Sequence, residues 1–301
     1  MDCVPYRPEL SGSLTELVNE HIQRIPPHWT LSQGQVEHIL NNPSAWRKHY
    51  PEETTPDSRE MWCLVDQQQV LAAGQFAYTA APDPITKNRT GGIDWCFAKP
   101  QQPHAVSKLV ETIVSQAQAA GLSEISLGRN QFGLGWSGIP DAWMHVSWGL
   151  EAGGFQKTSQ WMIMQGRTDV SWEKKAVLPK NVTFEWIVDL EAAEWDVCAL
   201  LNYTMVGECS AWRIPAHFDG CPGSTRWTTL EWIGVEEPYQ RQGIGSRLLV
   251  EQLRAQRKVG VDDVMVWVET DNLEAVGFFR HFGFEDGPVC RGYERQDLGG
   301  D

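Results

Sequence analysis

The chain has 301 residues, 42% of them hydrophobic, and a formal net charge of -14 at pH 7. This length suits two ordinary domains, each able to bury a core of its own. The negative charge argues against nucleic acid or an anionic membrane surface as the main partner, because both reward clustered Lys and Arg. A neutral or cationic small substrate fits this charge better.

The seven cysteines are odd in number, scattered, and never spaced as Cys-x-x-Cys. This pattern indicates neither a disulfide framework nor a zinc site, so we expect reduced thiols and no metal. No stretch approaches the roughly 18 apolar residues of a membrane span, and the first residues lack the apolar core of a signal peptide. The sequence therefore predicts a soluble cytoplasmic protein and carries no signal for an oligomeric state.

The first half of the chain alternates predicted strands and helices. Strands are expected at 3–7, 61–66, 70–79, 93–98 and 124–127, and helices at 14–22, 33–40 and 105–119. The polar segment Gln67-Gln68-Gln69 between two strands is typical of a hairpin. A Gly-x-Gly-x-x-Gly pattern at 133–138 precedes Pro140 rather than a long helix, which favours an inserted loop over a dinucleotide site.

The polar, lysine-containing segment 169–181 is the predicted linker between a first domain at 1–168 and a second domain at 182–301. The second half predicts strands at 182–190, 227–235 and 264–269, and helices at 191–205 and 244–258. About 47 residues lie between Val182 and Thr229, against about 90 in the matching part of the first half. The second half therefore cannot hold two early helices and a full-length hairpin. Either 207–226 supplies a shortened substrate side, or the first domain completes it.

The two halves look like divergent copies of one unit. Ile93-Asp94-Trp95 aligns with Leu230-Glu231-Trp232, and Gly154-Phe155 aligns with Gly283-Phe284. The matching order of elements predicts a tandem duplication. The copies differ in the loop after the aligned strand, which contains glycines at 239–245 but reads Gln-Gln-Pro-His-Ala at 101–105.

The glycine-containing loop has the features of an anion site. It joins a strand to an amphipathic helix, so that backbone N–H groups gather at the N-terminus of that helix. Gly243 and Gly245 let a phosphate approach the backbone, and Arg241 adds a positive charge beside it. Taken alone, a Gly-x-Gly before a helix is equally typical of a tight strand-to-helix turn.

Residues 227–295 resemble the GNAT acyltransferase superfamily. The resemblance rests on the strand 230–235, on Gln240-x-x-Gly243-x-Gly245, and on the segment from Asn272 to Phe284. Residues 60–165 resemble the family more weakly, through the order of elements and the Gly-Phe ending. The resemblance implies an α/β fold with two tandem GNAT-like domains, each a mostly antiparallel mixed sheet flanked by helices. The N-terminal copy would be degenerate.

The resemblance also implies a reaction, the transfer of an acetyl group from acetyl-CoA, the co-substrate, to an amine of an unidentified small-molecule acceptor. The loop would bind the pyrophosphate, the strand before it would splay to pair with the pantetheine arm, and Asn272 would contact the same arm. Backbone N–H groups near 233–235 would stabilise the oxyanion. The implied coenzyme-binding residues are Ile233, Gly234, Val235, Gln240, Arg241, Gln242, Gly243, Ile244, Gly245, Ser246, Asn272, Ala275, Phe278 and Phe279.

Two catalytic roles need side chains. Strand alternation places Glu231 on the face expected to meet the acetyl group, so it is the candidate base, directly or through a water; a solvent-facing carboxylate is the equal alternative. Where many relatives carry a Tyr that protonates the leaving thiolate, this chain has Phe279. Tyr293, Cys290 or water would then supply the proton. The alternative is a non-catalytic acyl-CoA-binding or interaction module.

Overall fold

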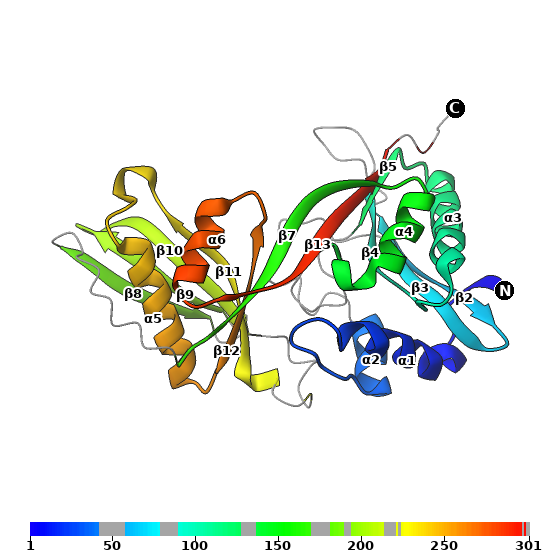
Figure 1. The fold of residues 1–301 in the computed structure, drawn as a ribbon, viewed down its shortest axis with the longest axis horizontal. Coiled ribbons are helices and arrows are strands. Elements are labelled where there is room, and N and C mark those ends of the chain that lie inside the picture. The colour runs from blue at the N-terminus through cyan, green and yellow to red at the C-terminus, as the bar shows by residue number, and fades with distance from the viewer. Residues whose placement is uncertain are drawn as a thin grey trace. The chain divides into compact units, whose positions relative to one another are not determined.

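The computed structural model describes residues 1–41, 58–78, 90–127, 137–169, 181–189, 194–213, 221, 224–296 and 298. The chain divides into two compact units (Figure 1): unit 1 consists of Met1–Trp161 and Pro288–Asp301, and unit 2 of Met162–Gly287. The last residues of the chain thus group with the N-terminal copy. Residues 288–301 therefore belong to unit 1, whereas the sequence predicts a second domain that continues to residue 301.

Unit 1 is built on a sheet with the strand order β1-β2-β3-β4-β5-β13, antiparallel except for the parallel pair β4 and β5. Its strands are β1 (Asp2–Pro5), β2 (Ser58–Asp66), β3 (Gln69–Tyr78), β4 (Thr90–Ala98), β5 (Glu124–Leu127) and β13 (Glu285–Arg295), with β6 (Ile139–Pro140) paired to β13. Its helices are α1 (Ser11–Ile22), α2 (Gln33–Asn41), α3 (Pro103–Ala119) and α4 (Met144–Ala152). Strands β1 to β5 and helices α1 to α3 lie where the sequence predicts strands and helices, whereas α4, β6 and β13 have no predicted counterpart.

Helices cover both faces of the sheet of unit 1. Successive side chains of a strand point to opposite faces. The ring of Phe97 in β4 lies 5.3 Å from the ring of His21 in α1. A Cβ on Gly74 in β3, which pairs with the residue before Phe97, would lie 3.4 Å from Leu109 and 3.5 Å from Ile113 of α3. Helices α1 and α3 therefore bury opposite faces of one sheet.

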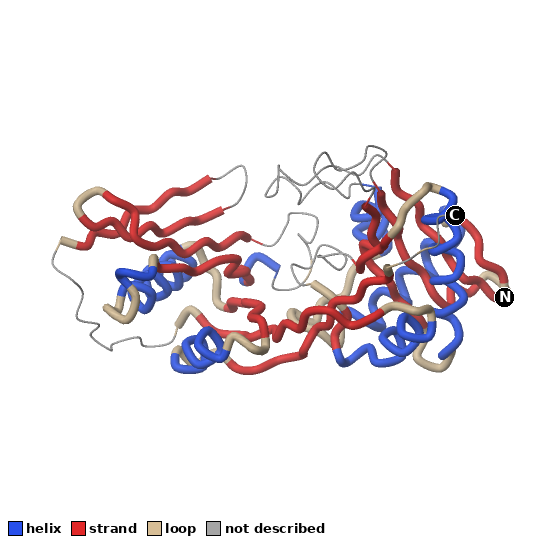
Figure 2. The backbone as a smooth tube through the Cα atoms, turned by 90° about the horizontal axis from the view of Figure 1, so that it is seen from above, coloured by secondary structure: helices blue, strands red, loops and turns tan. Residues whose placement is uncertain are grey.

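Unit 2 contains a sheet with the order β8-β9-β10-β11-β12, antiparallel except for the parallel pair β11 and β12. Its strands are β8 (Val182–Asp189), β9 (Glu194–Leu201), β10 (Thr204–Arg213), β11 (Trp227–Val235) and β12 (Asp263–Glu269), and its helices are α5 (Ile244–Lys258) and α6 (Leu273–His281). Helix α5 packs against β9, β10 and β11, and α6 contacts β12. In Figure 2 the helices of unit 2 lie on one side of its strands.

The last strand of each copy joins the sheet formed mainly by the other copy. Strand β7 (Gln156–Arg167) ends the first copy, yet its residues from Met162 onward belong to unit 2, where β7 neighbours β12. Strand β13 ends the second copy, yet its residues Glu294 and Arg295 pair with β5 of unit 1. The two copies have thus exchanged their C-terminal strands, an arrangement that the order of elements in the sequence does not reveal.

The helix predicted at 191–205 is wrong. From Glu194 onward, where the structure describes it, the segment forms β9, a two-residue turn at Asn202 and Tyr203, and the start of β10. Both turn residues have positive φ, 49° and 67°, as a tight hairpin turn requires. The sequence around Ala199 and Leu200 has good helix propensity, but burial between β8 and β10 overrides it.

Two predicted features fall largely outside the described residues. These are the glycine pattern at 133–138, of which only Ser137 and Gly138 are described, and residues 170–180 of the predicted linker. Within the described part of the chain, the helices are all too short or too polar to cross a membrane.

Candidate functional site

The loop between β11 and α5 presents a helix N-terminus. Gly243 is the N-cap of α5 and has a φ of 82°, a left-handed conformation that glycine adopts without strain. Arg241 also has a positive φ, of 60°. The first N–H groups of a helix lack partners within the helix, and α5 receives no side-chain cap at this end. Backbone donors of residues 244–246 are therefore available to an anion.

Side chains of the loop stabilise its shape. Gln240 Nε2 donates to the carbonyl oxygen of Val235 at 2.9 Å, and Gln242 Nε2 donates to that of Pro238 at 3.1 Å. Two of the predicted coenzyme-binding side chains thus fold back onto the backbone of their own loop. Such contacts preorganise the backbone N–H groups that follow.

Arg241 extends from the loop and pairs with Glu274 of α6. Both side chains are 79% exposed, so this surface pair adds little to stability. The pair holds the guanidinium of Arg241 beside the N-terminus of α5, where a phosphate could replace the carboxylate of Glu274 as the partner of Arg241.

The surroundings of Gly245 are open. A Cβ built at this position would touch only Val235 Cγ2, at an ordinary contact distance of 3.6 Å. The neighbouring Ile244 is buried and anchors the first turn of α5, while Ser246 is half-buried. Packing of Ile244 therefore holds the first turn of α5 in place, while Gly245 remains accessible to a phosphate.

Strands β11 and β12 separate beside this loop. Their parallel pairing runs from Trp227 with Asp263 to Leu230 with Val266. Beyond that point β11 continues to Val235 and β12 to Glu269. The edge of β11 that faces β12 is consequently open over its last residues, which include Ile233 and Gly234. This is the splay that the family resemblance implies.

Glu231 occupies a β-bulge. Ser210 of β10 pairs with Trp232 and Ala211 pairs with Leu230, so Glu231 is the extra residue on β11. A bulge re-aims side chains locally and is frequent next to active sites. Glu231 is partly exposed at the point where the two strands begin to separate. Simple strand alternation, on which its predicted orientation relied, does not hold at this residue.

The same bulge occurs in unit 1. Gln75 of β3 pairs with Trp95 and Phe76 pairs with Ile93, which leaves Asp94 as the extra residue on β4. Asp94 is the residue that aligns with Glu231 in the repeat. The structure therefore supports the duplication at the level of a single backbone irregularity, which alternating hydrophobicity did not reveal.

Helix α6 provides the remaining predicted coenzyme-binding residues. Asn272 is its N-cap, and its side-chain oxygen accepts the N–H of Ala275 at 3.0 Å. Phe278 is half-buried, whereas Phe279 is 2% exposed and packs 5.1 Å from the ring of Phe284. Phe279 is a core residue and offers no hydroxyl. Asn272 has a structural role in capping that leaves its amide nitrogen for another partner.

The two candidate replacements for the acid lie in unit 1. Tyr293 is 1% exposed, and its hydroxyl donates to Glu151 of α4 at 3.3 Å. Burial raises its pKa, and a hydrogen bond with Ser147 opposes that shift. Cys290 is also buried, and burial raises the pKa of its thiol. Both groups are therefore poor proton donors to a thiolate.

The described residues of unit 1 differ from unit 2 at the matching positions. Helix α3 begins at Pro103 and is preceded by Gln102, with no glycine in the loop. Helices α4 and α6 have nine residues each, and Trp143 precedes α4 as Asn272 precedes α6. Trp143 is fully buried 5.3 Å from the ring of Phe97, and its Nε1 donates to the carbonyl oxygen of His21. An indole thus fills the space beside the end of β4.

Comparison with known proteins agrees with this geometry. Residues 160–284 match the family described as acetyltransferase (GNAT) family. No curated protein matches the chain. Its fold is similar over 100% of its length to a tandem GNAT protein from the clavulanic acid biosynthesis pathway, with a TM-score of 0.66, 12% identity and 99% of that protein covered.

A second similar structure is a GCN5-related N-acetyltransferase from Sphaerobacter thermophilus, with a TM-score of 0.66 and 14% identity; the match covers 100% of this chain and 96% of that one. A glucosamine N-acetyltransferase region of a fungal multi-domain β-N-acetylglucosaminidase matches 97% of this chain and 38% of that one, with a TM-score of 0.67 and 14% identity. Residues 160–284 thus form a GNAT-family domain, and the chain has the fold of tandem GNAT proteins. This confirms the predicted family for that segment and the predicted fold class.

Proposed function

We propose that unit 2 binds acetyl-CoA and transfers its acetyl group to an amine of a small-molecule acceptor. One coincidence carries the proposal: the open N-terminus of α5, the free space at Gly245 and the separation of β11 from β12 meet in one place. These features fit a pyrophosphate followed by an extended arm that adds to a strand edge. Unit 1, with Trp143 and a loop without glycine, would bind no coenzyme.

The residues have distinct roles in the proposed reaction. Backbone N–H groups of 244–246 and the guanidinium of Arg241 hold the pyrophosphate. Backbone N–H groups of 233–235 donate to the carbonyl oxygen as it becomes an oxyanion. Glu231 accepts a proton from the amine, directly or through a water, so that the nucleophile is neutral.

The acceptor nitrogen forms a bond to the acetyl carbon, which gives the oxyanion. The oxyanion then collapses as the bond from carbon to sulfur breaks, the thiolate leaves, and the nitrogen releases its extra proton to water. Phe279 has no proton to donate, and Tyr293 and Cys290 are buried in unit 1. We assign the final protonation to water, because a thiol with a pKa near 8.5 is a tolerable leaving group at neutral pH. The net charge of -14 favours amine acceptors, since a cationic substrate is attracted to the protein.

The test of the coenzyme site is a graded series at Gly245. Gly245→Ala fits the free space and should bind acetyl-CoA, whereas Gly245→Leu should block the phosphate. Loss of two hydrogen bonds to a charged phosphate costs about 3 kcal/mol, or roughly a hundredfold in affinity by calorimetry. Gly34→Leu is the matched control. Like Gly245, Gly34 lies in a helix with free space around it, and no atom lies within 4 Å of its Cβ position. Equal affinity for both leucine variants would refute the site.

Turnover is tested with labelled acetyl-CoA and a panel of amines. Transfer to any acceptor, with a lower kcat and unchanged acetyl-CoA affinity in Glu231→Gln, would support the reaction and the role of the carboxylate. Tight binding without transfer across a broad panel would instead favour an acyl-CoA-binding module. The buried Phe279, which has no hydroxyl to donate a proton, is the observation that favours an acyl-CoA-binding module.

A further inference from the structure

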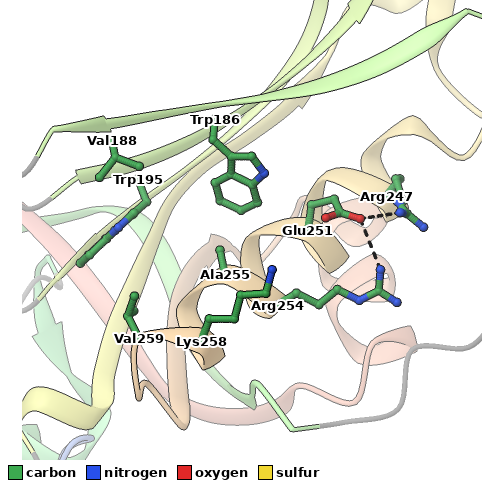
Figure 3. Close-up of a pocket in the computed structure, with 9 residues that line it drawn as sticks. All are labelled: Trp186, Val188, Trp195, Arg247, Glu251, Arg254, Ala255, Lys258 and Val259. Atoms are coloured by element: carbon green, nitrogen blue, oxygen red, sulfur yellow. Dashed lines mark hydrogen bonds and ion pairs between the residues drawn. The ribbon is translucent and has the colours of Figure 1, made fainter.

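A pocket lies between helix α5 and the edge of the sheet in unit 2 (Figure 3). Its volume is about 520 Å³, within the range typical of small-molecule sites. The sheet contributes Trp186 of β8 and Trp195 of β9, and the helix contributes Arg247, Glu251, Arg254 and Lys258. The pocket therefore combines an aromatic wall with a charged one.

The pocket results from the width of the sheet. Helix α5 packs against β9, β10 and β11, while β8 lies one strand farther out at the end of the sheet order. The inner face of β8 therefore extends past the helix, and Trp186 is left 37% exposed. Figure 3 shows this ring above the helix, directed toward the charged side chains of α5.

This side of α5 is distinct from the proposed coenzyme site. The coenzyme features involve β11, β12, α6 and the first residues of α5, whereas the pocket lies along β8 and β9 at the other end of the sheet order and meets α5 from Arg247 onward. Its helical residues recur every three or four positions, so they form a single stripe along the length of α5. The pocket is not a continuation of the loop at 239–245.

The charges of the pocket are unbalanced. Glu251 accepts Arg247 at 2.5 Å and Arg254 at 3.3 Å, so one carboxylate serves two guanidinium groups. Lys258 forms no ion pair with any residue in the described ranges, and its ammonium group points into the space below Trp186 in Figure 3. Three cations thus face one anion on a protein whose net charge is -14.

A buried donor accompanies this excess charge. The Nε of Arg247 is removed from solvent and has no hydrogen-bond partner among the described residues. A buried donor without a partner is costly, so we expect a water molecule to accept from it.

We propose that this pocket binds a small aromatic organic anion, a planar ring bearing one carboxylate, sulfonate or phosphate group. The ring packs against Trp186, and the anionic group contacts Lys258 and Arg254. Aromatic packing accounts for the exposed indole, and charge complementarity excludes the cationic amines proposed as acetyl acceptors. The site is independent of acetyl transfer and holds whether or not unit 2 turns over acetyl-CoA.

The probe pair is 1-anilinonaphthalene-8-sulfonate and N-phenyl-1-naphthylamine, which share their ring system but differ by the sulfonate. The full-length protein should bind the sulfonate at one site per chain by calorimetry, and the neutral amine at least about fivefold more weakly. Lys258→Gln and Arg254→Gln should each weaken the sulfonate by roughly fivefold, the loss expected for one charge-assisted contact. Trp186→Ala should weaken both probes.

Arg257→Gln is the matched control, because Arg257 is an exposed cation next to Lys258 on α5 but does not line the pocket. It should leave the sulfonate affinity unchanged, as should Gly245→Leu, which separates this site from the coenzyme site. Equal affinity for both probes, or equal effects of Arg257→Gln and Lys258→Gln, would overturn the proposal. A dimer that dissociates in Trp186→Ala would also overturn it, since a second copy of the chain would then cover this face.

Discussion

Acid should destabilise unit 1 through the buried histidine pair His21 and His145. His21 is 1% exposed, its Nδ1–H donates to the carbonyl oxygen of Leu17 at 2.8 Å, and its Nε2 lies 3.0 Å from His145 Nε2. The Nε2–H of His145 also reaches the carbonyl oxygen of Ala98 at 2.8 Å. This arrangement satisfies two neutral rings, and a proton on His21 Nε2 would place two donors against each other.

The magnitude follows from the pKa of His21. Burial lowers it from 6.5 to about 3, with further lowering by His145 and Arg24 and a partial opposing effect from the hydrogen bond to Leu17. Since the folded-state pKa is lowered, the stabilisation is fully present above pH 6.5 and is lost as the pH falls toward 3. Between pH 8 and pH 5 this single group should remove about 2 kcal/mol of unfolding free energy.

The assay is urea unfolding of the wild-type chain and of His21→Gln at pH 8 and pH 5. The variant is less stable at pH 8 but should lose about 2 kcal/mol less than the wild type on acidification. His104→Gln, at an exposed position in the first turn of α3, should follow the wild type. Parallel losses for the wild type and His21→Gln would refute the reasoning, because they would show that other groups carry the acid sensitivity.

Two further predictions concern a helix contact and a helix cap. Gly149→Ala should destabilise unit 1 by about 1–3 kcal/mol in urea, because the new Cβ would lie 2.2 Å from Val106 Cβ. Gly34→Ala, at an open helix position, should instead stabilise the chain by about 0.5–1 kcal/mol. An unchanged stability of Gly149→Ala would show that α3 and α4 can move apart. Asn272→Ala should cost about 1 kcal/mol of stability by removing the cap on the N–H of Ala275, and Asn272→Asp should restore it. If both Asn272 variants lose equal stability, the cap is not the source.

The elements nearest the candidate site could be predicted from sequence with accuracy. Strand β11 and helix α5 have the predicted bounds, Trp227–Val235 and Ile244–Lys258. Their hydrophobic periodicity is strong, and glycines mark the turn between them, so local signals agree with the tertiary environment. The roles of the site residues remain predictions, to be tested by the variants above.

Prediction failed where pairing between strands decides the conformation. The described part of the segment 191–205 has helix-forming composition, but its strand β9 pairs on both sides, with β8 and with β10. The bulges at Asp94 and Glu231 likewise depend on pairing with a neighbouring strand, so no periodicity along one strand shows them.

The sequence by itself determined the duplication, the single glycine loop and its placement at the start of a helix, because each depends on residues adjacent in the chain. Only the tertiary structure decided the exchange of β7 and β13, the filling of unit 1 by Trp143 and the pocket beside Trp186. Each of these results from packing between segments far apart in sequence. Burial of apolar surface stabilises such contacts whatever the order of the segments in the chain. The pattern of residues along the sequence therefore does not reveal them.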